Sequence, residues 1–320
     1  MKLFRMTLLS LTLIFFSGCR DEKQKGKDVF EGTITISGAF ALYPLVVKWG
    51  KEFEKIHPRV RVDISAGGAG KGMADALSDN VNLGMVSRDL KAEEISKGAW
   101  GITVARDAVV PTFNTSNPNG RDILSKGLNK EKFLRIWLGS SFKTWGDVLN
   151  NGSEDHLNVY TRSDASGAGE TWAKFLGKAQ EDLKGTGVFG DPGLAEAVRK
   201  DKFSIGFNNI AYVYDLRTQK PYEGLGIIPI DFNNNGTIDE EENFYGDHQK
   251  FIDAMAQGRY PSPPARELYF VSNGPPKDRL VIEFFKWILT DGQKFVPEAG
   301  YLRLSPGLVK AESEILESYY

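Results

Sequence analysis

Short apolar stretches alternate with amphipathic stretches along most of the chain. Residues 33–37, 59–65 and 82–86 have the character of strands, the first two by a period of two and the third by a short apolar run. Between them, residues 43–56 repeat their apolar positions with helical spacing, and a second helix is expected at 73–78. This strand–helix alternation predicts an α/β fold with a mainly parallel sheet.

The same alternation continues toward the C-terminus, and the length of 320 residues suggests two domains or one large one. A proline-rich stretch at 260–264 resists both helix and sheet, and we expect the chain to cross between domains there. We therefore assign residues 31–108 and 266–320 to domain 1, and residues 109–265 to domain 2. Further strands are expected at 103–113, 157–161, 203–207 and 268–272, and further helices at 131–139, 170–176, 251–257 and 279–290, while another element begins at 145–149.

The N-terminus has the features of a secretory signal. Lys2 and Arg5 precede an apolar run at 8–16, which is too short to span a bilayer. Two small residues then precede Cys19, and this arrangement resembles the bacterial lipobox, in which the cysteine is lipidated. We predict a lipoprotein signal peptide over 1–19, lipidation at Cys19, and a solvated linker over 20–30. The alternative is a plain signal peptide with a chance cysteine.

Composition narrows the possible functions. Hydrophobic residues make up 41% and charged residues 26% of the 320 residues, as in soluble globular domains. The net charge of −2 offers no basic field for a nucleic-acid backbone. One cysteine and three histidines make a Cys/His zinc site improbable, and no nucleophile beside a base is suggested. His57 precedes a proline as a helix cap, while His156 and His248 are expected in solvent.

Three glycine-rich turns share one design. Residues 37–42, 67–72 and 166–169 each follow an expected strand and precede an expected helix. Helix N-termini carry unpaired backbone N–H groups, and small residues let an anion approach them closely. The second turn is not a P-loop, because a glycine follows Lys71. Ordinary α/β proteins also contain such turns, but three of them together with Arg162 favour an anion site.

Motifs spread over residues 32–305 carry a family resemblance. In order, they are Ile36-Ser37-Gly38-Ala39, Tyr43-Pro44-Leu45, Gly68-Ala69-Gly70-Lys71-Gly72-Met73, Gly84-Met85-Val86-Ser87-Arg88, Asn117-Pro118, Ile136-Trp137-Leu138-Gly139, Arg162 with Ser166-Gly167, and Ile205-Gly206-Phe207. With this order and spacing, the chain resembles the PstS-type phosphate-binding proteins of ABC transporters. The resemblance implies a two-domain, type II periplasmic-binding fold, an anion in the cleft between the domains, permease partners and a monomeric state.

The resemblance also implies a set of phosphate-binding positions. The matching positions are Ala41, Leu42, Tyr43, Ala69, Gly70, Arg88, Arg162, Ser166, Gly167 and Ala168.

Several of these positions depart from the family pattern. Hydroxyl side chains of the family are replaced at Leu42, Ala69 and Ala168. Arg88 stands where the family has an acidic residue that accepts the phosphate proton; it either binds the anion or forms a salt bridge at the domain edge. Asp89 or Asp164 is then the candidate proton acceptor. Selectivity between phosphate and other oxyanions therefore stays open.

Residues 231–242 fit the twelve-residue calcium loop of EF-hands. Gly236 occupies the sixth position, where the loop turns sharply. A strand-like segment precedes the loop in place of a helix, so we expect bound Ca²⁺ to have a structural role; the alternative is an acidic turn without metal. The predicted ligands are Asp231, Asn233, Asn235, Thr237, Asp239 and Glu242.

Together these patterns predict a lipid-anchored solute-binding protein outside the cytoplasm. It would capture inorganic phosphate by domain closure for an ABC importer, without enzymatic activity, catalytic cofactor or nucleic-acid partner. One alternative is a binder of sulfate, molybdate or another oxyanion. The other is a surface lipoprotein with an interaction role and no part in transport.

Overall fold

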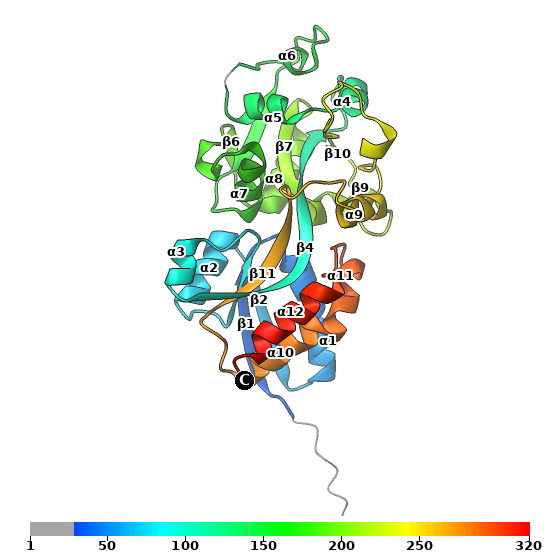
Figure 1. Cartoon of the computed structure of the whole chain (residues 1–320). Helices are drawn as coiled ribbons and strands as arrows, with labels where there is room; N and C mark the ends of the chain where they lie inside the picture. The colour runs from blue at the N-terminus through cyan, green and yellow to red at the C-terminus, as the bar shows by residue number, and fades with distance from the viewer. Residues whose placement is uncertain (1–28, 140) are drawn as a thin grey trace, which may run out of the picture.

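The computed structural model describes residues 29–139 and 141–320. The predicted signal peptide, Cys19 and most of the predicted linker lie outside these residues. The described chain forms two lobes, one above the other in Figure 1, joined by two long strands. No helix in the described part of the chain combines the length and the apolar character needed to cross a bilayer.

Lobe 1, the lower lobe in Figure 1, is built on the parallel strands predicted at the start of the chain. β1 (Gly32–Gly38) lies between β2 (Val60–Ala66) and β3 (Leu83–Val86). The helix α1 (Tyr43–Ile56) spans the predicted range and buries Trp49 among other apolar residues. The other helices of this lobe are α2 (Ala69–Leu77), α3 (Ala92–Ser96), α10 (Arg279–Leu289), α11 (Phe295–Glu298) and α12 (Pro306–Glu317).

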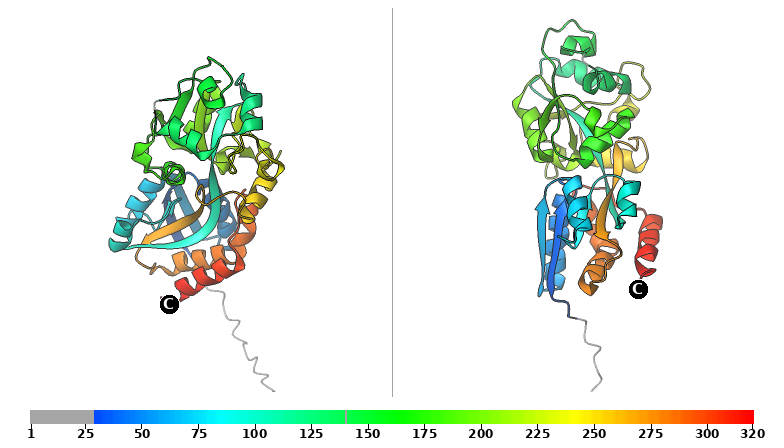
Figure 2. Two further views of the ribbon diagram at one scale, coloured as in Figure 1. Left: turned by 45° about the horizontal axis from the view of Figure 1, so that its top comes forward. Right: turned by 90° about the vertical axis from the view of Figure 1, so that its left-hand side faces the viewer.

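Two antiparallel strands run from one lobe into the other. β4 (Ala99–Asn114) is 16 residues long and almost entirely buried, and β11 (Ala265–Asn273) pairs with it. In this pairing Arg266 lies opposite Asp107. Both views of Figure 2 show these strands passing between the lobes, so any movement of the lobes must bend them.

Lobe 2 continues the sheet in the order β4-β7-β5-β6. Its strands are β5 (Asn158–Arg162), β6 (Thr186–Val188), β7 (Ser204–Asn209) and β10 (Leu225–Ile227), with a small pair formed by β8 (Tyr214–Asp215) and β9 (Lys220–Pro221). Its helices are α4 (Gly120–Lys126), α5 (Lys130–Trp137), α6 (Trp145–Leu149), α7 (Gly167–Leu176), α8 (Gly190–Lys200) and α9 (His248–Ala256). The α/β fold class predicted from the sequence is confirmed.

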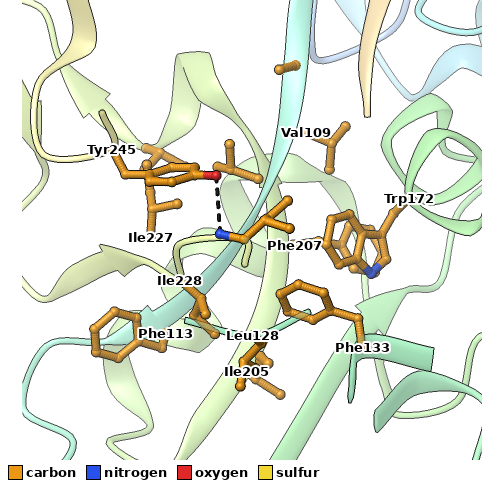
Figure 3. Packing of buried hydrophobic residues seen from close by; sticks show 14 of the residues in the cluster. Val109, Phe113, Leu128, Phe133, Trp172, Ile205, Phe207, Ile227, Ile228 and Tyr245 are labelled. Carbon is orange, nitrogen blue, oxygen red and sulfur yellow. Dashed lines mark hydrogen bonds between the residues drawn. The ribbon is translucent and has the colours of Figure 1, made fainter. Parts of the chain in front are cut away.

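Each lobe has its own apolar core. In lobe 2, Trp172 stacks on Phe207 with ring centroids 6.0 Å apart, and the Tyr245 hydroxyl accepts a hydrogen bond from the Ile230 amide at 3.2 Å (Figure 3). The core of lobe 1 is formed by buried residues up to Ala105 and from Leu268 onward in the sequence. The core of lobe 2 is formed by buried residues between these two positions. The domain division at 108/109 and 265/266 stays a proposal, and these two cores support it.

Several elements differ from the sequence-based expectation. α2 begins at Ala69 and α7 at Gly167, each three or four residues earlier than expected, because small residues form the first helical turn. α8 was not expected, since it opens with the turn-like sequence Gly190-Asp191-Pro192-Gly193. His248 is only 4% exposed, so the prediction that it is solvated was wrong.

Candidate functional site

The three glycine-rich turns lie at the carboxyl ends of strands and meet at the junction between the lobes. The first follows β1 and the second follows β2, and the Gly67 and Gly68 amides donate to the Gly38 carbonyl at 2.9 and 3.0 Å. The third follows β5 in lobe 2. The Gly70 amide donates to the Ala165 carbonyl at 3.0 Å, which joins the second turn to the third.

Two glycines allow this close approach. Gly38 has φ +129°, and a Cβ on it would lie 2.4 Å from the Met85 carbonyl oxygen. A Cβ on Gly167 would lie 2.2 Å from the Ser87 hydroxyl and 2.5 Å from the Ser87 carbonyl oxygen. Ser87 belongs to lobe 1 and Gly167 to lobe 2, so the lobes touch directly beside the predicted anion site.

Arg162 ends β5 and is buried between two carboxylates. Its Nε and Nη2 atoms donate to Asp164 at 2.8 and 2.7 Å, and Nη1 donates to Asp191 at 2.6 Å. Burial lowers the pKa of Arg162, but pairing with Asp191 and Asp164 outweighs burial and raises it. One guanidinium between two ionised carboxylates leaves a local charge of −1. Asp191 was not recognised from the sequence, since it lies 29 residues from Arg162 in no shared motif.

Asp164 also lies beside the backbone of both lobes. It accepts a hydrogen bond from the Gly190 amide at 3.1 Å, and it lies 2.8 Å from the position of a Cβ on Gly68. Asp89, the other carboxylate considered as a proton acceptor, is exposed and paired with Lys174. Of the two, only Asp164 lies beside the glycine-rich turns.

Arg88 forms ion pairs in this structure. Its Nη1 and Nη2 atoms donate to Glu94 at 2.8 and 2.6 Å, and Nε lies 3.2 Å from a Glu170 oxygen. Burial of Arg88 lowers its pKa. The hydrogen bond to Glu94 and the charge of Glu170 outweigh burial, so the pKa of Arg88 is raised overall. The described contacts therefore match the salt-bridge role of Arg88, one of the two roles that the sequence left open.

The remaining predicted site residues line the turns with mostly apolar side chains. Ala41, Leu42, Ala69 and Ala168 are buried, and Tyr43 is half-buried. The Ser166 hydroxyl accepts a hydrogen bond from the Gly169 amide at 3.1 Å and so caps α7. Among the described residues, no acceptor is seen for the hydroxyl hydrogen of Ser166, which can therefore donate to an anion.

Two tyrosines fix the first turn and were not found from the sequence. The Tyr301 hydroxyl donates to the Ala41 carbonyl at 2.7 Å, and the Tyr212 hydroxyl donates to the Phe40 carbonyl at 3.0 Å. Tyr212 belongs to lobe 2, so its bond to Phe40 also crosses between the lobes.

The predicted calcium loop folds back on itself. Asp231 accepts hydrogen bonds from the Asn235 and Gly236 amides at 3.2 and 3.0 Å, and Glu242 accepts one from the Phe232 amide at 2.8 Å. These bonds bring three of the predicted ligand residues, Asp231, Asn235 and Glu242, into one bend. Within residues 29–139 and 141–320, however, no group of three or more His, Cys, Asp or Glu side chains is placed to hold a metal ion.

Similar proteins include named phosphate-binding proteins. The phosphate-binding protein PstS of Xylella fastidiosa strain Temecula1 is 25% identical over 323 residues, covering 90% of this chain and 85% of the relative. PstS of Methanocaldococcus jannaschii is 22% identical, with coverage of 96% and 90%. Both relatives are named as binding proteins, which agrees with the prediction of a solute-binding protein without enzymatic activity. The predicted resemblance to PstS-type proteins is confirmed.

Solved structures and a family model agree on the fold. A putative phosphate ABC transporter substrate-binding protein with bound phosphate from Clostridium perfringens has a TM-score of 0.69 at 20% identity, covering 86% of this chain and 100% of that chain. An ABC-type phosphate transport receptor from Vibrio cholerae has a TM-score of 0.61 at 19% identity, with coverage of 85% and 100%. A model described as PBP superfamily domain matches residues 24–292. The chain therefore belongs to the periplasmic-binding-protein (PBP) superfamily and has its type II fold.

Proposed function

We propose that this protein captures inorganic phosphate outside the cytoplasm and delivers it to an ABC importer. One observation carries the proposal: three glycine-rich helix N-termini from both lobes meet beside the buried Arg162. Such a junction offers backbone N–H donors, helix dipoles and a guanidinium to one small anion. The names of the PstS relatives support phosphate as that anion.

In this proposal the anion binds to the backbone of the turns, to Arg162 and to the Ser166 hydroxyl. The missing hydroxyls at Leu42, Ala69 and Ala168 leave the backbone amides and Arg162 as the main donors.

Charge at the site favours a protonated oxyanion. Arg162 already faces Asp164 and Asp191, so a fully ionised anion would meet a local charge of −1. An anion that carries its own proton can instead donate a hydrogen bond to a carboxylate, and Asp164 is our candidate acceptor. Phosphate keeps a proton at neutral pH, whereas sulfate and molybdate do not.

We further propose that binding works by closure of the lobes, because an anion at this junction touches both lobes only when they approach each other. Lipidation at Cys19 would hold the monomeric protein at a membrane beside its permease. The buried, apolar Leu42, Ala69 and Ala168 favour a second candidate function: a site that has lost anion binding and serves as an interaction module.

Calorimetric titration with phosphate, sulfate and molybdate tests the proposal. The protein is first unfolded and refolded to remove any anion that it carries. Phosphate is expected to bind roughly 5- to 150-fold more tightly than sulfate, because a buried carboxylate without a proton donor opposite it costs about 1–3 kcal/mol. A preference for sulfate or molybdate would change the ligand, and the absence of any binding would favour the interaction module.

We also propose that residues 231–242 bind one Ca²⁺ ion with a structural role. Asp231 and Glu242 are buried and already oriented by backbone amides, while Asn233 and Asn235 place amide groups beside Asp239. The Ile238 amide donates to the Ser125 carbonyl at 2.9 Å, so an ordered loop would be fixed to the end of α4. Oxygen-rich loops of this spacing suit calcium.

Thermal unfolding in the presence and absence of calcium tests this site. Calcium is expected to raise the Tm of the protein by several degrees, since a ligand that binds only the folded state stabilises it. Glu242→Gln should lose this effect, and Glu241→Gln, which changes the exposed neighbour, should keep it. Calcium binding would be rejected if metal analysis found no calcium and the Tm of the protein did not respond to it.

A further inference from the structure

Ion pairs join the lobes at a second place, beside the two crossing strands. The segment after β3 belongs to lobe 1, and α7 belongs to lobe 2. Glu170 of α7 lies 3.2 Å from Arg88 Nε and 3.1 Å from Lys91 Nζ. Lys174 of α7 pairs with Asp89. All three pairs therefore connect one short segment of lobe 1 with one helix of lobe 2.

The position of these pairs on α7 relates them to the candidate anion site. Glu170 and Lys174 are four residues apart, so they lie on the same face of the helix. Ser166 caps the N-terminus of this helix, and the third glycine-rich turn is its first turn. A force that holds Glu170 and Lys174 against lobe 1 therefore also holds the third turn against lobe 1.

Arg88 is prepared for this contact by its own lobe. Two hydrogen bonds to Glu94 fix its guanidinium, and the residue is only 7% exposed. Its Nε atom makes no hydrogen bond of good geometry among the described residues and faces Glu170 at 3.2 Å. Because the guanidinium is already oriented, little side-chain entropy is lost when Glu170 approaches it.

The ion pairs line a pocket open to water. This pocket has a volume of about 540 Å³, and its wall includes Arg106 and Arg266 of the crossing strands as well as Lys178. Water and salt ions can reach the pairs through it. The exposed pairs Asp89–Lys174 and Lys91–Glu170 weaken as salt rises, whereas the buried Arg88 is screened less.

We propose that Arg88, Asp89, Lys91, Glu170 and Lys174 form an ionic latch that favours the closed arrangement of the lobes. The latch sets how tightly phosphate is held without touching it, and it makes that affinity sensitive to ionic strength. Arg88 is thus a positioning residue rather than a ligand of the anion. The inference rests on the proposed function, because phosphate affinity is one of its two readouts.

The physical basis is a shift in population. When the lobes separate, the opposite charges of the latch move apart, whereas contacts within each lobe remain. Ion pairs that exist only in the closed form lower its free energy relative to the open form. The apparent affinity for the anion rises with the fraction of molecules that are closed.

A charge exchange between Asp89 and Lys174 tests the latch in the full chain. Both side chains are exposed, at 65% and 61%, so their replacement leaves the cores intact. Asp89→Lys and Lys174→Asp are made separately and together. Lys178→Asp is the matched control, because Lys178 lines the same pocket and no ion pair is described for it in residues 29–139 and 141–320. Phosphate affinity is measured at low and high salt, and the separation of the lobes is measured by small-angle X-ray scattering.

Each single exchange is expected to weaken phosphate binding at low salt by roughly two- to fivefold, as for an exposed ion pair. The double exchange should restore affinity and compactness, and Lys178→Asp should change neither. High salt should reduce the difference between the single variants and the original protein. Glu170→Gln, which removes the charge shared by Arg88 and Lys91, should have a larger effect than either single exchange.

The latch is overturned if the double exchange fails to restore binding, or if Lys178→Asp weakens binding as much as Lys174→Asp does. If the original protein binds no phosphate at all, the proposed function fails instead. Scattering without ligand then still decides the latch: lobes that stay as close in the two single exchanges as in the original protein and the double exchange reject it.

Discussion

Burial determines the behaviour of single residues in this protein. Arg162 is ionised in the interior because two carboxylates surround it, and its removal would leave Asp164 and Asp191 buried without a cation. His248 shows the opposite case. Its Nε2 atom lies 3.0 Å from the Gly300 carbonyl oxygen, and its ring packs edge-on against Tyr214.

The buried His248 should make the protein less stable in acid. Burial lowers the pKa of His248 below its usual value of 6.5, so the unfolded chain binds this proton more readily than the folded protein does. The free energy of unfolding therefore falls as pH drops through 6.5, by at most about 1.4 kcal/mol per pH unit for one group.

Urea unfolding between pH 7.5 and 5.5 measures this effect. His248→Gln keeps a donor near Gly300 but cannot be protonated, so its stability should depend less on pH than that of the original protein. His156→Gln, which replaces an exposed histidine, is the matched control. An unchanged pH dependence in His248→Gln would contradict this account of the residue.

At the scale of elements, strand-to-helix turns build the candidate site, and the sequence predicted where they lie. The pattern of apolar positions located β1, α1 and β2 to within a residue or two. The start of α7 was not predictable from periodicity, since its first turn consists of glycine and alanine. Asp191 was not predictable either, because the contact with Arg162 depends on how α8 packs beside β5.

Gly167 should control how closely α7 approaches lobe 1. In Gly167→Ala the new methyl group would meet the Ser87 carbonyl oxygen, which cannot move without moving β3. We expect phosphate affinity to fall by at least about tenfold, as for small displacements of binding groups, while the Tm without ligand changes little.

Gly307→Ala provides the matched control, since nothing lies within 4 Å of a Cβ there. Calorimetry measures the phosphate affinity of both variants, and thermal unfolding measures their Tm without ligand. Unchanged affinity in Gly167→Ala would mean that the lobes do not come this close when the anion is bound.

At the scale of the whole molecule, two lobes with separate cores are joined by hydrogen bonds, ion pairs and the ring contact between Phe40 and Phe189. The Tyr212–Phe40 and Gly70–Ala165 hydrogen bonds join the lobes at the candidate site. The ion pairs of the proposed latch join them beside the crossing strands β4 and β11. Family resemblance implied the two lobes and the cleft, and a salt bridge of Arg88 at the domain edge was one of two roles left open. The partner residues in lobe 2 could not be predicted, because they lie about 80 positions away in the sequence. Such contacts are set by tertiary packing and leave no local pattern in the sequence.

Titration of the original protein and of Arg162→Ala with phosphate, side by side after removal of carried-over anion, tests the central claim most directly. We predict that the original protein binds one phosphate per chain and that Arg162→Ala loses at least about a hundredfold in affinity, because a charged hydrogen-bond donor to a buried anion is removed. Near-ultraviolet circular dichroism checks that the variant keeps its tertiary fold. Equal phosphate affinity in both folded proteins would contradict the placement of the anion at the junction of the two lobes.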